Sequence, residues 1–152
     1  MNDIALVWNS ATGRADFAMA GADIQMDAGL RTEVIIRLFS DRLADPADTL
    51  PDNSDDRRGW WGDLPLSGDP RTAGADRIGS GLWLLARELQ TQETQRRAEN
   101  YANTALAPMK QRGAVGSIQV RALYPRLGWI ELVITLNQQG SSVVYNFAWQ
   151  AS

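Results

Sequence analysis

The residues that could carry chemistry in this chain are few, because the sequence contains no histidine and no cysteine. A Ser-His-Asp triad, a Cys-His pair and metal sites built on imidazole or thiolate are therefore excluded. The glycine-rich stretch GDPRTAGADRIGSG matches neither the GxxxxGK[ST] phosphate loop nor a GxGxxG that follows a strand, so flexible connection is the better interpretation. The sequence predicts no cofactor.

Carboxylates remain as candidate catalytic or metal-binding groups. A glycosidase needs only two acids about 5 to 9 Å apart, but a solvated surface charge is the ordinary explanation for the glutamates of this chain. A cluster of aspartates lacks the Asp-x-Asp-x-Asp-Gly loop and terminal glutamate of a calcium site, so loop solvation is the better interpretation. The glutamates are Glu33, Glu88, Glu93, Glu99 and Glu131, and the clustered aspartates are Asp45, Asp48, Asp52, Asp55 and Asp56. The sequence predicts no catalytic residue and no metal ligand.

The stretch DDRRGWWGDLP places two adjacent tryptophans, Trp60 and Trp61, between glycines and close to Arg58 and Asp63. Large aromatic side chains beside arginine have the composition of interface hot spots, which favours a partner anchor. An indole that folds back over its own domain as a lid is the alternative, and a sugar-stacking platform is a third interpretation. We expect Arg58, Trp60, Trp61 and Asp63 to contact a partner.

Composition restricts the class of protein. The chain has 152 residues, 44% of them hydrophobic and 22% charged, which matches one ordinary globular domain over residues 1–152. A net charge of −3 and a pI near 4.9 provide no basic field for nucleic acid. No signal-peptide pattern and no membrane-spanning apolar run is evident, so we expect synthesis in the cytosol and no membrane partner.

The amino-terminal half predicts a hairpin and a helix. Alternation at 4–8 and 15–19 around NSATG is typical of a β-hairpin. The spacing of Leu30, Val34, Ile35, Leu38 and Phe39 predicts a helix over 28–39, capped by Asp27. The run VIIRLF is rich in β-branched residues, so a strand with Val34, Ile36 and Leu38 on one side remained an alternative.

The middle of the chain predicts a long loop and then helical structure. Residues 40–81 show no periodicity, and so long a stretch inside a compact domain suggests a segment that a partner orders. Leu82, Leu85 and Leu89 form a short apolar stripe, and Thr91 is placed to cap the helix that follows. That helix carries a strong amphipathic pattern, formed by Ala98, Tyr101, Ala102, Ala105, Leu106 and Met109. Pro108 should kink or end it, and Gly113 should close the segment.

Three alternating runs at 118–122, 130–136 and 143–149 predict an antiparallel meander, which makes the fold class α+β: an N-terminal β-hairpin, central helices and a C-terminal three-stranded β-meander. The last run ends near the carboxyl terminus, so one sheet edge is expected to be open to a strand from another chain. The residues expected to meet that strand are Val143, Tyr145, Phe147 and Trp149.

Two blocks of sequence resemble a known family. RGWWGD at 58–63 and the G-S-x-L-W-L-L-x-R pattern at 79–87, followed by a β-rich carboxyl end, closely resemble the phage Mu-like family of gene 46 products, small baseplate proteins of contractile tails. The resemblance covers nearly the whole chain and adds Trp83 and Arg87 to the expected partner contacts. Many members have arginine where this chain has Gly81, which puts any role for that position in doubt.

The family looks distantly similar to the gene 25 product of phage T4, a baseplate wedge subunit once labelled a lysozyme. The resemblance implies a structural, non-enzymatic wedge component, present in sixfold copies in the virion tail, that contacts wedge and hub proteins and helps to start assembly of the tail sheath. In those relatives a Gly-Glu-Arg-like block docks on partner helices, and here only Arg42 is carried over from it. The rival functions are a peptidoglycan hydrolase and a carbohydrate-binding module.

Overall fold

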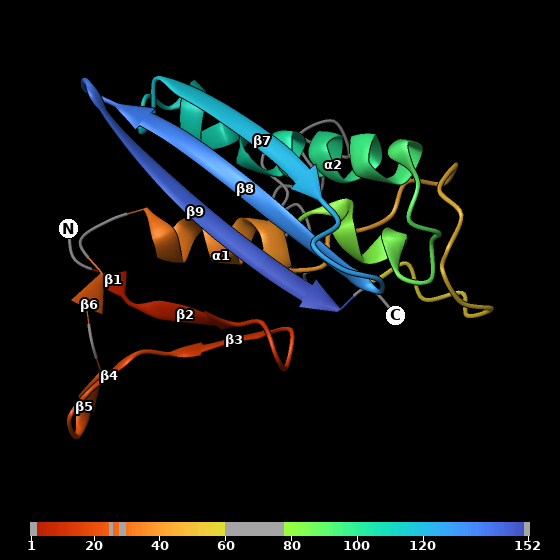
Figure 1. Ribbon diagram of the computed structural model, residues 1–152, viewed down its shortest axis with the longest axis horizontal. Helices are drawn as coiled ribbons and strands as arrows, with labels where there is room; N and C mark the ends of the chain where they lie inside the picture. The colour runs from red at the N-terminus through yellow and green to blue at the C-terminus, as the bar shows by residue number, and fades with distance from the viewer. Residues whose placement is uncertain (1–2, 25, 28–29, 60–77, 151–152) are drawn as a thin grey trace, which may run out of the picture.

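The computed structural model describes residues 3–24, 26–27, 30–59 and 78–150. It confirms the α+β class, with short strands at the amino terminus, helices in the middle and a three-stranded antiparallel sheet at the end (Figure 1). The elements are β1 Asp3–Ile4, β2 Leu6–Asn9, β3 Arg14–Phe17, β4 Met19–Ala20, β5 Asp23–Ile24, β6 Met26–Asp27, α1 Arg31–Phe39, η2 Gly81–Leu85, α2 Gln92–Gln111, β7 Ser117–Leu123, β8 Trp129–Gln138 and β9 Ser141–Gln150.

The carboxyl-terminal sheet provides one wall of the core. Its strands lie in the order β7-β8-β9, as the three alternating runs predict. On β8, Leu132 and Ile134 face the helices and are completely buried, while alternate residues face the other side. A two-residue turn at Gln139 and Gly140 joins β8 to β9, and both residues have positive φ (44° and 85°), which suits the right-handed twist of the strands.

Helix α2 packs on the sheet next to β7 (Figure 1). Its start is confirmed at Thr91, whose hydroxyl accepts a hydrogen bond from the Thr94 amide at 3.1 Å. Its apolar face is confirmed too, because Ala98, Ala102 and Leu106 have no exposed surface. The helix continues through Pro108 to Gln111, and Gly113 follows with φ 82°.

Helix α1 differs from its predicted start. It begins at Arg31 after Leu30, which makes no side-chain cap, whereas Asp27 belongs to β6, so the predicted cap is wrong. Val34 and Leu38 are buried, but Ile36 is 40% exposed, which rules out the strand alternative. The helical spacing of the apolar residues therefore predicted this segment correctly, and the strand propensity of its β-branched residues did not.

The amino-terminal hairpin is shorter than predicted, because only β2 and β3 pair in it. Ile4 lies in β1, which pairs with β6, and Met19 lies in β4, which pairs with β5. The buried Thr32 hydroxyl joins this region to α1, accepting from the Leu6 amide and donating to the Ile4 carbonyl, each at 3.1 Å.

The leucine stripe before α2 is partly wrong. Leu82 and Leu85 are buried in the single-turn 3-10 helix η2, but Leu89 follows its end and is 78% exposed. The tighter 3-10 geometry and the stop at Ala86 end the periodicity that the stripe assumed.

A carboxylate bridge links the two helices and predicts a pH effect. Burial raises the pKa of Glu33, but hydrogen bonds from Arg112 and Arg37 lower it by more, so the net direction is below its ordinary value. The bridge therefore stabilises the fold above the pKa of the unfolded chain, and this stabilisation is lost as pH falls through the folded pKa. We expect Glu33→Gln to cost about 1 kcal/mol at pH 7 and less in acid, measured by urea unfolding across that range. Asp55→Asn, which removes a carboxylate at an exposed loop position, is the control and should leave the free energy of unfolding at pH 7 unchanged.

Candidate partner-binding site

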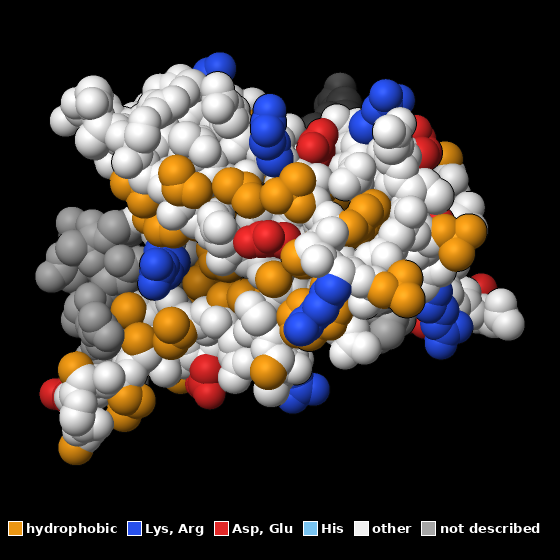
Figure 2. All heavy atoms as spheres, in the orientation of Figure 1, with side chains coloured by type: hydrophobic (Ala, Val, Ile, Leu, Met, Phe, Trp, Pro, Cys, Tyr) orange, Lys and Arg blue, Asp and Glu red, His pale blue; other side chains and the backbone are white. Residues whose placement is uncertain are grey.

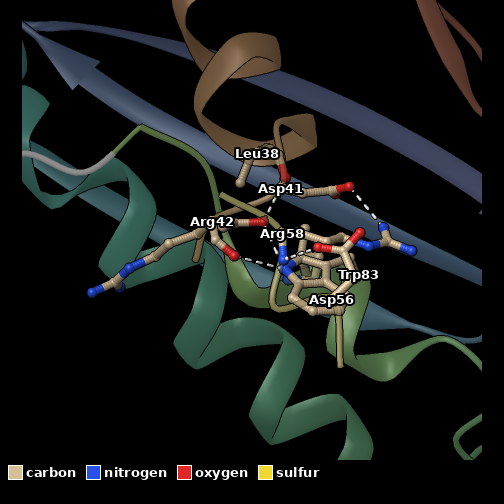
Figure 3. A network of polar contacts seen from close by, with 8 residues as sticks. Leu38, Asp41, Arg42, Asp56, Arg58 and Trp83 are labelled. Carbon is tan, nitrogen blue, oxygen red and sulfur yellow. Dashed lines mark hydrogen bonds and ion pairs between the residues drawn. The ribbon is translucent and has the colours of Figure 1, made fainter. Parts of the chain in front are cut away.

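The two sequence blocks that resemble the gene 46 family meet in space at a cluster that we call the Arg58 clasp: Arg58, Asp41 and Trp83 (Figure 3). The Arg58 guanidinium lies 4.4 Å from the centre of the Trp83 ring, and its Nη1 lies 2.7 Å from Asp41 Oδ2. Arg58 has φ 53°, and its amide donates to Asp56 Oδ1 at 2.8 Å. The clasp joins the end of α1, the loop that follows and η2.

Trp83 is a buried residue of this chain. It is 8% exposed, packs with Ala44 and Leu84 in a second apolar cluster, and its Nε1 donates to the Arg42 carbonyl at 2.9 Å. In Figure 3 the Arg42 side chain extends away from this network, and the residue is half-buried. The structure thus holds Trp83 inside the chain and leaves the Arg42 guanidinium directed outward.

Backbone contacts support the clasp on the side of η2. Ser80 forms a parallel bridge with Asp41: its amide donates to the Ser40 carbonyl at 2.9 Å, and its carbonyl accepts from the Arg42 amide at 3.1 Å. The buried Ser80 hydroxyl donates to the Leu38 carbonyl at 2.5 Å. Gly79 precedes it with φ 104°, a conformation that side chains other than glycine rarely adopt.

Gly59 and Gly79, which lie on either side of 60–77 in the sequence, both pack closely beside the clasp. Gly59 lies so close to Leu43 that a Cβ at this glycine would be 3.0 Å from the leucine Cβ, and a Cβ at Gly79 would be 2.9 Å from the Arg42 amide nitrogen. Gly59 and Gly79 therefore both lie beside residues 42–43. Trp60, Trp61 and Asp63 lie outside the described residues, so their partner contacts stay a prediction.

The described part of the loop after α1 is held by its own polar groups. The Arg57 carbonyl accepts from the Ala44 amide at 3.0 Å, and its Nη1 donates to the Asp45 carbonyl at 2.5 Å. The aspartates cap local turns: Asp52 Oδ1, for example, accepts from the Ser54 hydroxyl at 2.7 Å. Among the described residues no three acidic side chains form a metal-ligand group.

At the predicted sheet-edge site on β9, the backbone is more accessible to a partner than the aromatic side chains are. Phe147 is 3% exposed, and Tyr145 and Trp149 are half-buried against the core, whereas Val143 is 42% exposed. Arg87 is exposed with φ 72°, and lies apart from this edge just after η2.

Sequence reasoning missed the partners of several acids. Glu88 pairs with Arg97 at 3.0 Å, and Glu99 Oε1 accepts from the Ala122 amide at 3.0 Å. It also missed Asp41 and Ser80, since neither belongs to a recognisable spacing and both act through contacts distant in sequence. The only available signal was that Ser80 lies within the second of the two blocks, at 79–87.

A largely apolar groove of about 540 Å³ lies beside the clasp. Residues of β2, β3, α1, η2 and the carboxyl end of β9 line it, including Trp8, Phe39 and Trp149. Figure 2 shows hydrophobic side chains gathered in a band across this face, between the sheet and the amino-terminal strands. The groove's acids are Asp41 and Glu88, and each is paired with an arginine.

The clasp yields a prediction. We expect Arg58→Ala to lower the free energy of unfolding by about 1 kcal/mol, because the residue is partly exposed, and to speed hydrogen exchange of the Trp83 indole. Arg58→Lys keeps the charge but not the flat guanidinium, so its free energy of unfolding and its Trp83 exchange rate should lie between those of the natural chain and those of Arg58→Ala. NMR of the indole N–H signals, assigned with Trp83→Phe, measures the effect, and Arg96→Ala on exposed α2 surface is the control. An unchanged Trp83 signal in Arg58→Ala would contradict the clasp.

No described helix is both long and apolar enough to cross a bilayer. The model of the family described as Phage protein GP46 matches residues 30–143. The chain is 47% identical over 149 residues to Baseplate protein gp46 of Escherichia phage Mu, covering 97% of this chain and 95% of the relative. It is 31% identical over 134 residues to Mu-like prophage FluMu protein gp46 of Haemophilus influenzae, covering 88% and 85% of the two chains. The match thus spans the α1 helix, both blocks of the clasp and most of the carboxyl-terminal sheet, and the chain belongs to the phage GP46 family.

Proposed function

We propose that this protein is a structural subunit of a phage tail baseplate, made in the bacterial cytoplasm and incorporated into the virion tail. The observation that carries the proposal is the 47% identity, over nearly the full length of both chains, to a protein named for the baseplate of phage Mu. That identity and coverage support a common fold, and a common fold supports a similar place in an assembly.

The finer role that we propose is a wedge component, repeated in six copies, that contacts wedge and hub proteins and helps to start the sheath. Two surfaces support it. The first is the Trp60–Trp61 pair, which directly follows Gly59 in the sequence; burial of two indoles against a partner would favour binding by about 25 cal/mol per Å2 of apolar area. The second surface is the outer edge of β9, which could accept an extended segment of another chain.

The acids of the groove support a structural role over a hydrolase. The catalytic acid of a glycosidase lies in an apolar site without a cation in contact, whereas Asp41 and Glu88 each form an ion pair with an arginine. A cell-wall turbidity assay tests the hydrolase, and quenching of tryptophan fluorescence by oligosaccharides tests a carbohydrate-binding module.

The assembly experiment replaces both tryptophans. We expect Trp60→Ala with Trp61→Ala to fold with an unchanged melting temperature but to be missing from purified tail baseplates, because the anchor contributes to a partner and not to the chain's own core. Mass spectrometry of the purified tails measures incorporation. Leu127→Ala, at an apolar residue 92% exposed elsewhere, is the control and should incorporate normally. Gross unfolding of the double variant would support the lid interpretation instead.

A further inference from the structure

The sheet β7-β8-β9 has two outer edges, and the register identifies which backbone groups point outward. In an antiparallel ladder every second residue directs its N–H and C=O away from its partner strand. The two-residue turn makes Gln138 and Ser141 a hydrogen-bonded pair, so on β9 the residues that point outward include Val144, Asn146 and Ala148. On β7 the same alternation gives Ile118, Val120 and Ala122.

Two side chains of α2 cap the β7 edge at Ala122, near the carboxyl end of that strand. Glu99 Oε1 accepts from the Ala122 amide at 3.0 Å, and Gln95 Nε2 donates to the Ala122 carbonyl at 3.3 Å. One acceptor and one donor for a single residue is what a neighbouring strand would supply. Gln95 and Glu99 are four residues apart and so lie on one face of α2, which runs alongside β7 (Figure 1).

The β9 edge is occupied only at its carboxyl end. Trp8 Nε1 donates to the Ala148 carbonyl at 2.9 Å, so β2 blocks the ladder there. Among the described residues, none hydrogen-bonds to the outward backbone groups of Val144 or Asn146. Near this free stretch, the Arg31 guanidinium lies 5.5 Å from the Tyr145 ring centre and forms no ion pair with a described carboxylate.

We infer that a partner extends the sheet at the window Ser142–Asn146 on β9, where the outward groups of Val144 and Asn146 have no partner among the described residues, whereas Gln95 and Glu99 cap Ala122 on β7 and Trp8 caps Ala148 at the end of β9. The partner that fits is a short extended segment of another protein, about five residues long, with a carboxylate side chain directed toward Arg31. The inference deepens the proposed function and depends on strand addition being part of it. It gives the addition a place and a length.

The closed edge is tested on the isolated protein. We expect Gln95→Ala with Glu99→Ala to show at least about tenfold stronger self-association by sedimentation equilibrium, together with faster exchange of the Ala122 amide at low concentration. Glu93→Ala with Arg96→Ala changes two exposed residues of the same helix and should behave as the natural chain. A folded double variant with unchanged self-association and unchanged Ala122 exchange would overturn the role of the cap. Circular dichroism establishes folding, and if the double variant unfolds, Glu99→Leu alone replaces it, because leucine fills similar space but offers no acceptor to the Ala122 amide.

The window is tested in assembled tails. Asn146→Pro removes an outward N–H from an exposed position without removing a bond to β8, whereas Asn146→Thr keeps it. We expect the proline variant to reduce the yield of sheathed tails by about tenfold or more and the threonine variant to leave it unchanged. Equal yields from both, with the chain present in the baseplates, would overturn the window and leave the baseplate role standing. Absence of the natural chain from purified tails would instead refute the proposed function.

Discussion

Gly79→Ala is expected to lower the free energy of unfolding by more than about 2 kcal/mol, because two separate costs fall on this residue. Its φ of 104° is a conformation that a side chain makes strained. A Cβ there would also lie 2.5 Å from the Ser40 carbonyl oxygen, which is backbone and is held by the Ser80 amide, so it cannot move away easily. Urea unfolding of the purified protein measures the loss.

Gly113→Ala separates the two costs. Gly113 has a similar φ of 82°, but a Cβ there would meet nothing within 4 Å. We expect it to lose about 1 kcal/mol from conformation alone, so the difference between the two variants reports the close approach of residues 79 and 40. Equal losses would show that the bridge between Asp41 and Ser80 yields to the extra methyl group.

The clasp shows what sequence could and could not predict. The two blocks that contain Arg58 and Trp83 were recognisable as sequence, and both residues were expected to contact a partner. Their contact with each other was not predictable, because stacking across 25 positions leaves no periodicity. Trp83 in particular looks like an exposed anchor in sequence and is buried in the structure.

The helices and strands were easier to predict from the sequence. The pattern from Ala98 to Met109 and the alternation in 130–136 both predicted the buried face correctly, because one apolar face repeats at the period of the element. The start of α1 and the exposure of Leu89 were missed, since both depend on where a short element ends, which tertiary contacts decide. The edge caps at Ala122 and Ala148 were missed because a polar side chain that replaces a strand resembles any surface residue.

Trp8→Ala is expected to detach the amino-terminal strands from the body of the protein, at a cost of about 3 kcal/mol. Trp8 stacks on Phe39 with ring centres 3.7 Å apart and meets Phe147 and Trp149 edge-on, so one side chain joins β2 to α1 and β9. Among the described residues, the other contacts across this boundary are chiefly the hydrogen bonds of Thr32. We therefore expect hydrogen exchange to increase in β2 and β3 while α2 and β8 keep their protection.

Trp8→Phe is the matched control, because it keeps a ring on Phe39 but removes the N–H that bonds to Ala148. Its expected cost is about 1 kcal/mol, and the amino-terminal strands should stay protected. The same variant frees the Ala148 carbonyl and so lengthens the open edge of β9 beyond Asn146.

If Trp8→Ala unfolded in one transition with all strands losing protection together, the amino-terminal region would be an integral part of the core, and Trp8 would act as a core residue more than as a tie. If instead the amino-terminal strands detach and the sheet stays folded, the Ala148 carbonyl becomes accessible while the window Ser142–Asn146 stays intact. Trp8 would then have two separable roles: it ties the amino-terminal strands to the body of the protein, and it blocks the carboxyl end of the β9 edge.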